Sequence, residues 1–593
     1  MSSIVSAGTA SYDVYLGFWT NWSRGLILGS TVTLSKSHGA LLIAFLAIYV
    51  ASAGKSVWRI ACFAMHRRFS SQHPQDAVYH QRQAILRNVG NAQDAIWMLG
   101  NSLMMWRKNR ARQPVRRLMP IIVLAAVVSA VFSLAGIFSS QVASESINEV
   151  LLSGDRCGPL DSNDINNPTG YYSLFEPHQT QRVQAYASYA QRCYTETATT
   201  DDCNLYVTPQ LPTVANRNAG CPFESGMCKS DEGNLIIDTG YIDSNEHLGI
   251  NLPAEDRFSL RMYHHCAPLV TEGFAEPATD SSSQPVMRYF YGAAADSIGN
   301  FSYQMPINDS VASLLDSDKL STARLDYNIG FLKAYGGDPA MSAIYSMFNP
   351  IPQLSRPDAD VMLFFLSAPG IIYSREVDDP WFAAHRKGPV TLNVVSNVTR
   401  QNYYRDDLVS VMGCAMQTQL CNGERKSDED CTPLRGMSDD TFDRYSPWKT
   451  DRQRAMIKRA DDIFGLGLFT ISGIVDRLGL ASSPPDTAFP APSRDPPGNQ
   501  WQKEVEHWVT SSLTSVQGSF VEAANGPSDA MMGFRRLPNG TEEAQMCRSQ
   551  RIISPRYLSF SVLGLCLILI FGGVFMLLDF AVEPMVQYLR SVA

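Results

Sequence analysis

The stretch Leu118–Phe138 (LMPIIVLAAVVSAVFSLAGIF) decides the fold of this 593-residue chain, because its 21 residues carry no charged side chain. About 20 such residues cross the hydrocarbon core of a bilayer as a helix. Leu558–Leu578, an uncharged stretch of the same length, meets the same criterion. Gly39–Gly54 has only 16 uncharged residues, so it spans only if Lys55 extends its ammonium to the interface. A buried amphipathic helix is the alternative for that stretch. The sequence therefore predicts three membrane-spanning helices, 39–54, 118–138 and 558–578.

The segment between the first two predicted spans, residues 55–117, is strongly basic. It holds twelve Lys and Arg residues against two Asp, a net charge of +10, whereas 139–557 carries a net −18. Lys and Arg next to membrane spans are retained in the cytosol. We therefore expect 55–117 to be a cytoplasmic loop and 579–593 a cytoplasmic tail, with 1–38 and 139–557 outside the cytosol. No cleaved signal peptide is expected, because removing the first apolar stretch would place the basic segment in the lumen.

The cysteines agree with this topology. Ten of the twelve fall in 139–557, which is an even number in the segment assigned to an oxidising compartment. These disulfide candidates are Cys157, Cys193, Cys203, Cys221, Cys228, Cys266, Cys414, Cys421, Cys431 and Cys547. Short spacings favour three local pairs, namely Cys193–Cys203, Cys221–Cys228 and Cys414–Cys421. Cys62 in the cytoplasmic loop and Cys566 in the last span are expected to be free.

Asn-X-Ser/Thr sequons, the acceptors of N-linked glycans, follow the same division. The basic loop contains none. The glycosylation candidates are Asn21 in the N-terminal segment and Asn300, Asn308, Asn397 and Asn539 in 139–557. Charge, cysteine and sequon placement together predict an integral membrane glycoprotein of the plasma membrane or another secretory-pathway membrane.

Residues 139–557 are expected to form one large α+β, disulfide-bonded ectodomain between the second and third spans. Runs rich in β-branched or aromatic residues predict strands over 235–237, 360–366 and 390–395. Helical spacing of apolar residues from Trp501 to Phe520 predicts a helix that ends at Asn525-Gly526-Pro527. The apolar run 463–475 is too short to span a membrane and is expected to be a buried or interface-lying helix. The proline-rich connector 484–497 is the place where the domain would divide if it has two parts.

The cytoplasmic loop contains apolar residues at helical spacing, which predict one helix from Asp76 to about Arg107. Such a helix would pack under the membrane against lipid headgroups or dock a partner. The favoured alternative is that the basic residues of the loop only set the orientation of the chain. Because the loop shows no nucleic-acid-binding signature, membrane lipid is the expected partner and nucleic acid is not.

Leu235–Gly240 (LIIDTG) has the form of an aspartic-protease active-site loop. That chemistry requires two carboxylates that share a proton, and the chain contains no second Asp-Thr/Ser-Gly. The favoured alternative is a strand that ends in a turn, where Asp and Gly are common. Asp238 is then expected to accept hydrogen bonds from nearby backbone N–H groups and to fix the turn into Tyr241.

Three further motifs are also better explained without chemistry. Gly54-Lys55-Ser56 lacks the first glycine of a phosphate-binding loop. The adjacent residues His264, His265 and Cys266 seldom converge on one metal ion. Asp378-Asp379-Pro380-Trp381-Phe382 offers two carboxylates for a cation, but a turn capped by Asp and closed by Pro is favoured. We therefore expect no catalytic residue, cofactor or metal site.

Several short stretches are distinctive: 18–23 (FWTNWS), 83–88 (QAILRN), 221–223 (CPF), 237–244 (IDTGYIDS), 247–251 (HLGIN), 266–269 (CAPL), 378–382 (DDPWF), and Gly413-Cys414 through Cys421-Asn422. In these stretches the chain resembles a group of fungal multi-pass membrane proteins. The resemblance covers most of the chain. It implies a fungal origin and a multi-pass architecture, and because the group has no assigned activity it supplies no functional residues.

The function expected from the sequence is therefore binding rather than catalysis. A large acidic domain tethered to the membrane at both ends suits the recognition of an extracellular ligand or protein. One alternative is a subunit of an oligomeric channel or transporter, although the spans 118–138 and 558–578 contain no ionisable residue of the kind that pathways use. A second alternative is a membrane-anchored hydrolase whose active site is assembled from distant residues. The sequence leaves the oligomeric state open.

Overall fold

The computed structural model divides the chain into two compact units. Val14–Val150 and Ile553–Ala593 form one, here called the helical unit, and Met1–Asp13 with Leu151–Ile552 form the other, here called the disulfide-bonded domain. The structure describes residues 12–109, 113–138, 148–160, 171–195, 203–295, 299–307, 327–336, 339–368, 371, 373–393, 398–423, 425, 427–437, 447–464, 471–480 and 497–592.

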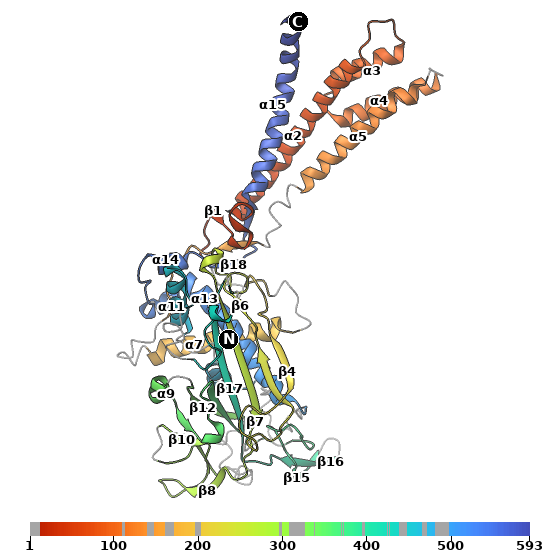
Figure 1. Ribbon diagram of the computed structural model, residues 1–593. Helices are drawn as coiled ribbons and strands as arrows, with labels where there is room; N and C mark the ends of the chain where they lie inside the picture. Colours follow the sequence, from red (N-terminus) through yellow and green to blue (C-terminus); the bar gives the residue numbers. More distant parts are fainter. Residues whose placement is uncertain are drawn as a thin grey trace. The chain divides into compact units, whose positions relative to one another are not determined.

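Three helices of the helical unit are long and apolar enough to cross a membrane, judged by length and composition. They are α2 (Lys36–Arg68), α5 (Pro114–Phe138) and α15 (Val562–Val592), all labelled in Figure 1. α2 extends over 33 residues because the helix continues through the basic residues that follow the predicted 39–54 span. The predicted start of the third span was too early, since Leu558–Ser561 belongs to strand β19 (Tyr557–Ser561).

A three-stranded antiparallel sheet leads into two of these helices. Its order is β1 (Gly17–Thr20), β2 (Ser30–Ser35) and β19, with the short helices η1 (Trp22–Arg24) and α1 (Gly25–Leu28) between β1 and β2. β2 is followed directly by α2, and β19 by α15. The fully buried Thr33 hydroxyl accepts a hydrogen bond from Trp19 Nε1 at 2.8 Å and contacts Ser559 Oγ at 2.9 Å. These buried bonds tie β1 and β2 to β19, the strand before the last helix.

Glycines let the three long helices approach one another closely, as small residues do between membrane helices. A Cβ atom on Gly54 of α2 would lie 2.7 Å from the ring of Phe132 in α5. The Tyr49 hydroxyl of α2 donates to the Leu569 carbonyl of α15 at 2.6 Å. Ten residues further along both helices, Arg59 and Asp579 form an ion pair at 3.3 Å. α2 and α15 therefore run in the same direction, as the expected topology requires.

The basic loop forms two helices where the sequence predicted one. α3 (Ala77–Asn88) and α4 (Ala92–Lys108) are separated by three residues. Asn91 begins the second helix, because its side chain accepts the Asp94 N–H at 2.8 Å, and Asp76 caps the first helix in the same way. One buried apolar cluster joins these helices to α2 and α5; it comprises Trp58, Cys62, Val78, Leu86, Val89, Ala92, Ala95, Leu99, Leu118, Ile121 and Ala125.

The disulfide-bonded domain is built on a seven-stranded antiparallel sheet with the order β12-β14-β17-β7-β5-β4, in which β6 also pairs with β7. The strands are β4 (Val214–Ala219), β5 (Asn234–Asp238), β6 (Ile242–Asp243), β7 (Phe258–Pro268), β12 (Asn328–Ala334), β14 (Asp360–Ser367) and β17 (Val409–Asn422). The strands predicted over 235–237 and 360–366 are confirmed as β5 and β14. The prediction over 390–395 overlaps β15 (Arg386–Asn393), and residues 394 and 395 lie outside the described part.

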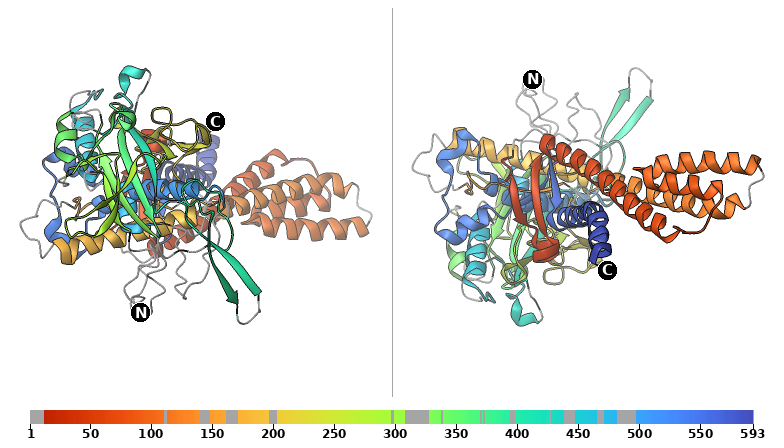
Figure 2. Two further views of the ribbon diagram at one scale, coloured as in Figure 1. Left: turned by 90° about the horizontal axis from the view of Figure 1, so that it is seen from below. Right: turned by 90° about the horizontal axis from the view of Figure 1, so that it is seen from above.

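Helices cover one face of this sheet, and smaller sheets cover the other (Figures 1 and 2). The helices are α7 (Glu176–Cys193), α11 (Asp451–Phe464), α12 (Ile471–Leu478) and α13 (Gln500–Asn525). β14 is buried on both faces: Met362 and Phe364 lie on the helical side, and Leu363 and Phe365 on the other. This double burial explains its unbroken apolar run.

The other strands and α-helices are mostly short. They are β3 (Glu149–Leu151), β8 (Ala275–Thr279), β9 (Pro285–Tyr289), β10 (Gly292–Ala294), β11 (Tyr303–Pro306), β13 (Phe348–Pro350), β16 (Val398–Tyr404), β18 (Arg551–Ile553), α9 (Pro339–Tyr345) and α14 (Thr541–Cys547). α13 confirms the helix predicted from Trp501 and ends before Gly526, as expected. The two ends of the predicted 463–475 helix fall in α11 and α12, and residues 465–470 between them lie outside the described residues. So does most of the connector 484–497.

Candidate functional site in the disulfide-bonded domain

All ten predicted cysteines form disulfides, and Cys62 and Cys566 are free. The predicted pairs Cys193–Cys203 and Cys221–Cys228 are confirmed. The predicted pair Cys414–Cys421 is wrong. The sheet register places Cys414 of β17 directly opposite Cys266 of β7, and these two are bonded. The remaining disulfides are Cys421–Cys431 and Cys157–Cys547.

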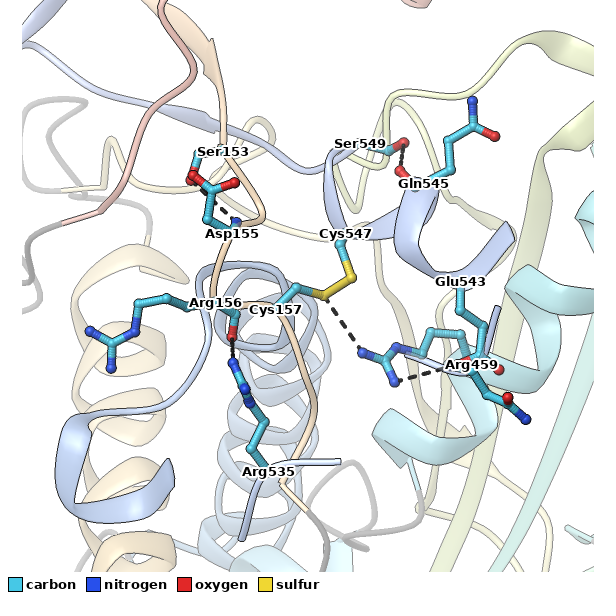
Figure 3. Close-up of a disulfide and its surroundings, with 11 residues drawn as sticks. Ser153, Asp155, Arg156, Cys157, Arg459, Arg535, Glu543, Gln545, Cys547 and Ser549 are labelled. Carbon is cyan, nitrogen blue, oxygen red and sulfur yellow. Dashed lines mark hydrogen bonds and ion pairs between the residues drawn. A yellow bond between two sulfur atoms is a disulfide. The ribbon is translucent and has the colours of Figure 1, made fainter. Parts of the chain in front are cut away.

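A buried arginine lies against the disulfide that joins the two ends of the domain. Figure 3 shows Arg459 of α11 directed at the Cys157–Cys547 bond, with its Nη2 3.6 Å from Cys157 Sγ. Its side chain is 2% exposed, and a carboxylate oxygen of Glu543 lies 3.9 Å from its Nη1. Desolvation by burial lowers the pKa of Arg459 to about 10, although the Glu543 carboxylate opposes this effect. The guanidinium therefore stays charged in a nearly apolar setting.

A second arginine–carboxylate pair connects α7 with α13. The Arg182 guanidinium contacts the Glu522 carboxylate, which His178 approaches at 3.2 Å and the Tyr186 hydroxyl at 3.3 Å. Arg182 Nη2 also donates to Ser519 Oγ at 3.2 Å. Burial raises the pKa of Glu522, but the charge of Arg182 and the hydrogen bond from His178 bring its pKa below the usual range.

Each arginine borders a small cavity. One is lined in part by Arg182, Ser519 and Glu522, the other by Arg459 and the Cys157–Cys547 disulfide, and both include Ile463 and Ala523. Each cavity measures about 10 Å³, which is room for about one water molecule. A water in the second cavity would lie beside Arg459 and Gln550, which both line it. The arrangement holds the C-terminal half of α13 in place, and it leaves no room there for a substrate.

Sequence reasoning missed both arginines, although α11 carried a signal. Met456, Ala460 and Ile463 repeat at helical spacing and form the buried face of α11, and Arg459 lies on the same face. A basic residue in line with buried positions indicates a buried cation that needs a counter-charge. No comparable signal marked Glu522 as the counter-charge of Arg182. Glu522 follows one turn after a run of buried small polar residues in α13, so a polar residue at that position does not stand out.

Asp238 holds a turn, as the sequence predicted. Its Oδ1 accepts the Gly240 N–H at 2.9 Å and Arg261 Nε at 3.0 Å, and its Oδ2 accepts Arg261 Nη2 at 2.5 Å. This two-point pairing with Arg261 lowers the pKa of Asp238. A carboxylate held in this way does not share a proton with a second carboxylate, as an aspartic protease requires.

Asp379 of the Asp378–Phe382 motif also forms a turn, and it joins that turn to α13. Its fully buried carboxylate accepts the N–H groups of Trp381 at 2.9 Å, Phe382 at 3.1 Å and Trp501 at 3.0 Å. Burial raises the pKa of Asp379 to about 6, although these N–H donors oppose the shift. Asp378 contacts the exposed His385 at 3.1 Å instead. The two neighbouring carboxylates therefore do not converge on a shared ligand.

His264 is fully buried in β7, beneath the helices, and neither of its ring nitrogens has a hydrogen-bond partner within the described part of the chain. Burial lowers the pKa of His264 to about 4, against a weaker opposing effect of the Asp238 charge. His265 faces the other way and contacts the Gly220 carbonyl at 2.8 Å. Alternation along the strand thus separates the two adjacent histidines, which excludes a shared metal ion.

We expect His264→Leu to make the domain less sensitive to acid. An unfolded histidine takes up a proton near pH 6.5 and buried His264 only near pH 4, so stability is complete above about pH 6.5 and falls by about 1.4 kcal/mol per pH unit below it. Leucine removes this loss and buries no unpaired nitrogen. The measurement is urea unfolding between pH 4 and 7, with His80→Gln on the exposed surface of α3 as the control. An unchanged pH dependence in His264→Leu would contradict the assignment.

The glycosylation candidates differ in accessibility. Asn300 and Asn539 are exposed. Asn21 is 2% exposed, and its Nδ2, the atom that would carry a glycan, donates to Glu149 Oε2 at 2.9 Å. Asn21 therefore does not fit a glycosylation site in the folded chain. Asn308 and Asn397 lie outside the described residues.

Among the described residues, no group of three or more His, Cys, Asp or Glu side chains is arranged to hold a metal ion. No protein family, curated protein or solved structure matches the chain. The resemblance to fungal multi-pass proteins therefore remains a prediction from the sequence, and the function is argued from the chain's own residues.

Proposed function

We propose that this chain is an integral membrane glycoprotein whose disulfide-bonded domain lies outside the cytosol and binds a protein partner there. Three helices of sufficient length and apolar character support membrane insertion. Five disulfides support an oxidising compartment for the domain, because cytosolic thiols are kept reduced. The free Cys62 belongs to the unit assigned to the membrane and cytosol.

The carboxylates that the sequence or the structure singled out are bound to other groups of the fold, and this favours binding over catalysis as the function of the domain. Asp238 is paired with Arg261, Glu522 with Arg182, and Asp379 accepts three backbone N–H groups. Each of these carboxylates has a structural role, so none is available as a base or nucleophile without breaking the fold. The surface of the domain also carries exposed apolar side chains that no described contact covers.

Among the described residues of the disulfide-bonded domain, one group of exposed apolar side chains lies beside an edge strand. Ile344 and Tyr345 of α9 and the following Met347 are 69%, 57% and 41% exposed. The Met347 N–H donates to the Lys333 carbonyl of β12, the edge strand of the seven-stranded sheet, at 2.7 Å. Exposed apolar side chains next to a sheet edge are a common docking surface for protein segments. These three residues, here called the α9 patch, are the proposed contact with the partner.

Photo-crosslinking in intact membranes tests this function. A benzophenone amino acid in place of Tyr345 should give a discrete crosslinked product, and Ile344→Ser with Met347→Ser should reduce its yield. The control places the same amino acid at Val214, which is 72% exposed on the opposite edge strand β4. No product from position 345, or the same product from both positions, would contradict partner binding at the α9 patch.

Glycan mapping tests the topology separately. Asn300 and Asn539 should carry glycans, so endoglycosidase should reduce the apparent mass, whereas Asn21 should be unmodified. A tag inserted between α2 and α3 should react with antibody only after the plasma membrane is permeabilised. Labelling of that tag on intact cells would reverse the proposed orientation.

A further inference from the structure

α4 carries an apolar surface that nothing in the described chain covers. Trp97, Met98, Met104 and Met105 are 70%, 48%, 72% and 64% exposed. They cluster over about two turns of the helix, because Trp97 and Met104, and likewise Met98 and Met105, are seven residues apart and share a side of the helix. Two exposed basic residues, Arg107 and Lys108, follow this surface at the C-terminal end of α4. The four apolar residues are here called the α4 face.

The opposite side of α4 packs against the beginning of α5. Ala92, Ala95 and Leu99 lie in one buried cluster with Leu118 and Ala125. Figures 1 and 2 show the two helices side by side. Leu118 is the first residue of the uncharged run that is assigned to the membrane, so α4 is held next to the cytoplasmic end of a span. The side of α5 away from this contact is also exposed and apolar, and it includes Met119 and Val123.

The charge near this surface is positive. Arg107, Lys108 and Arg116 are all exposed where α4 ends and α5 begins, and the segment 55–117 carries a net +10. The acidic residue of α4, Asp94, accepts the Asn91 side-chain amide at 2.7 Å and lies at the other end of the helix. An apolar face next to a basic end is the pattern of helices that lie in the headgroup region of anionic membranes.

We propose that α4 is an interfacial helix that binds the cytoplasmic leaflet. The α4 face contacts lipid acyl chains, and Arg107, Lys108 and Arg116 contact the phosphates of anionic phospholipids. Anionic lipid is favoured over a protein because α4 packs against the first residues of a membrane span and exposed basic residues lie at the end of the α4 face. Met105 lies about 4.5 Å along the helix from Lys108 at 1.5 Å per residue, so one side chain reaches acyl chains while the other reaches headgroups. The inference rests on the membrane assignment of α5 in the proposed function.

Depth-dependent quenching tests the proposal on the full-length chain. The protein, with Cys62→Ala and Cys566→Ala, is reconstituted into bilayers of phosphatidylcholine and phosphatidylserine, with or without brominated acyl chains. A fluorescent label is attached to Met98→Cys or Met105→Cys. His73→Cys, exposed between α2 and α3, is the aqueous control, and Val131→Cys, on the exposed surface of α5, is the membrane control. Bromolipid should quench the labels at 98, 105 and 131 but not the label at 73.

The outcomes separate the two proposals. Quenching at 131 without quenching at 98 and 105 overturns the interfacial helix and leaves the span intact, and a protein then becomes the better occupant of the α4 face. No quenching at 131 overturns the span assignment itself. The anionic-lipid contact predicts that Arg107→Gln with Lys108→Gln weakens quenching at 105 at least about twofold, and that omission of phosphatidylserine does the same. If neither the double substitution nor the omission of phosphatidylserine changes the quenching at 105, the proposed headgroup contact is wrong.

Discussion

Replacing Cys157 and Cys547 by alanine is expected to lower the free energy of unfolding of the disulfide-bonded domain by about 4–5 kcal/mol. This disulfide closes a loop of 390 residues, which is the largest separation among the five pairs. A cross-link stabilises mainly by restricting the unfolded chain, and the effect grows with the logarithm of loop length. Its loss also leaves Arg459 beside a small void, because the guanidinium loses its contact with Cys157 Sγ.

The measurement is urea unfolding of the purified full-length chain, followed by tryptophan fluorescence. The matched control removes Cys221 and Cys228, which are 7 residues apart, and should cost only about 2–3 kcal/mol. Equal losses in the two variants would show that loop closure is not the main contribution of the Cys157–Cys547 bond.

Lys333→Met should cost about 3–5 kcal/mol, because it leaves a buried carboxylate without its counter-ion. Lys333 Nζ lies 3.3 Å from Asp360 Oδ2, and the two side chains are 8% and 1% exposed. Burial raises the pKa of Asp360, against the opposing charge of Lys333, so without Lys333 its pKa rises further. When a carboxyl group has a higher pKa in the folded chain than in the unfolded chain, the free energy of unfolding falls as the pH rises. The destabilisation by Lys333→Met should therefore be larger at pH 8 than at pH 5.

Two variants control this second result. Lys333→Met combined with Asp360→Asn removes both charges and should recover most of the lost stability. Lys449→Met breaks a pair with Asp430 at 3.7 Å, but Lys449 is 51% exposed, so the cost should stay below about 1 kcal/mol. A Lys333→Met variant that is as stable as Lys449→Met would show that the Lys333–Asp360 pair has no net effect on folding.

The features that sequence alone revealed are those set by local pattern. Each of these features can be recognised within one continuous segment. They are the uncharged runs in α2, α5 and α15, the apolar strand β14 and the helical spacing in α13. The turn at Asp238 followed from the chemistry of Asp and Gly. The division between α3 and α4 was also local, since Gly90-Asn91 combines a helix stop with a capping residue, but the apolar positions on both sides obscured it.

The features that sequence missed depend on contacts between distant residues. Cys414 pairs with Cys266 because β17 and β7 are neighbours in one register, and no spacing along the chain records that pairing. Leu558–Ser561 forms a strand because β2, more than 500 residues earlier, lies beside it. Arg459 reaches the Cys157–Cys547 bond only after α11 packs in the fold. Patterns in one sequence indicate which face of a helix or strand is buried. They do not indicate which distant residues pack against that face.

The Cys157–Cys547 bond also determines what a protease can release. It joins residues near the two ends of the disulfide-bonded domain. A single backbone cut anywhere between residues 158 and 546 therefore leaves both fragments in one covalent molecule. Such a nicked chain would migrate as one band without reductant and as two bands with it. Release of the whole domain from the rest of the chain would require cuts on both sides of the bonded pair, so the domain stays attached after a single cleavage.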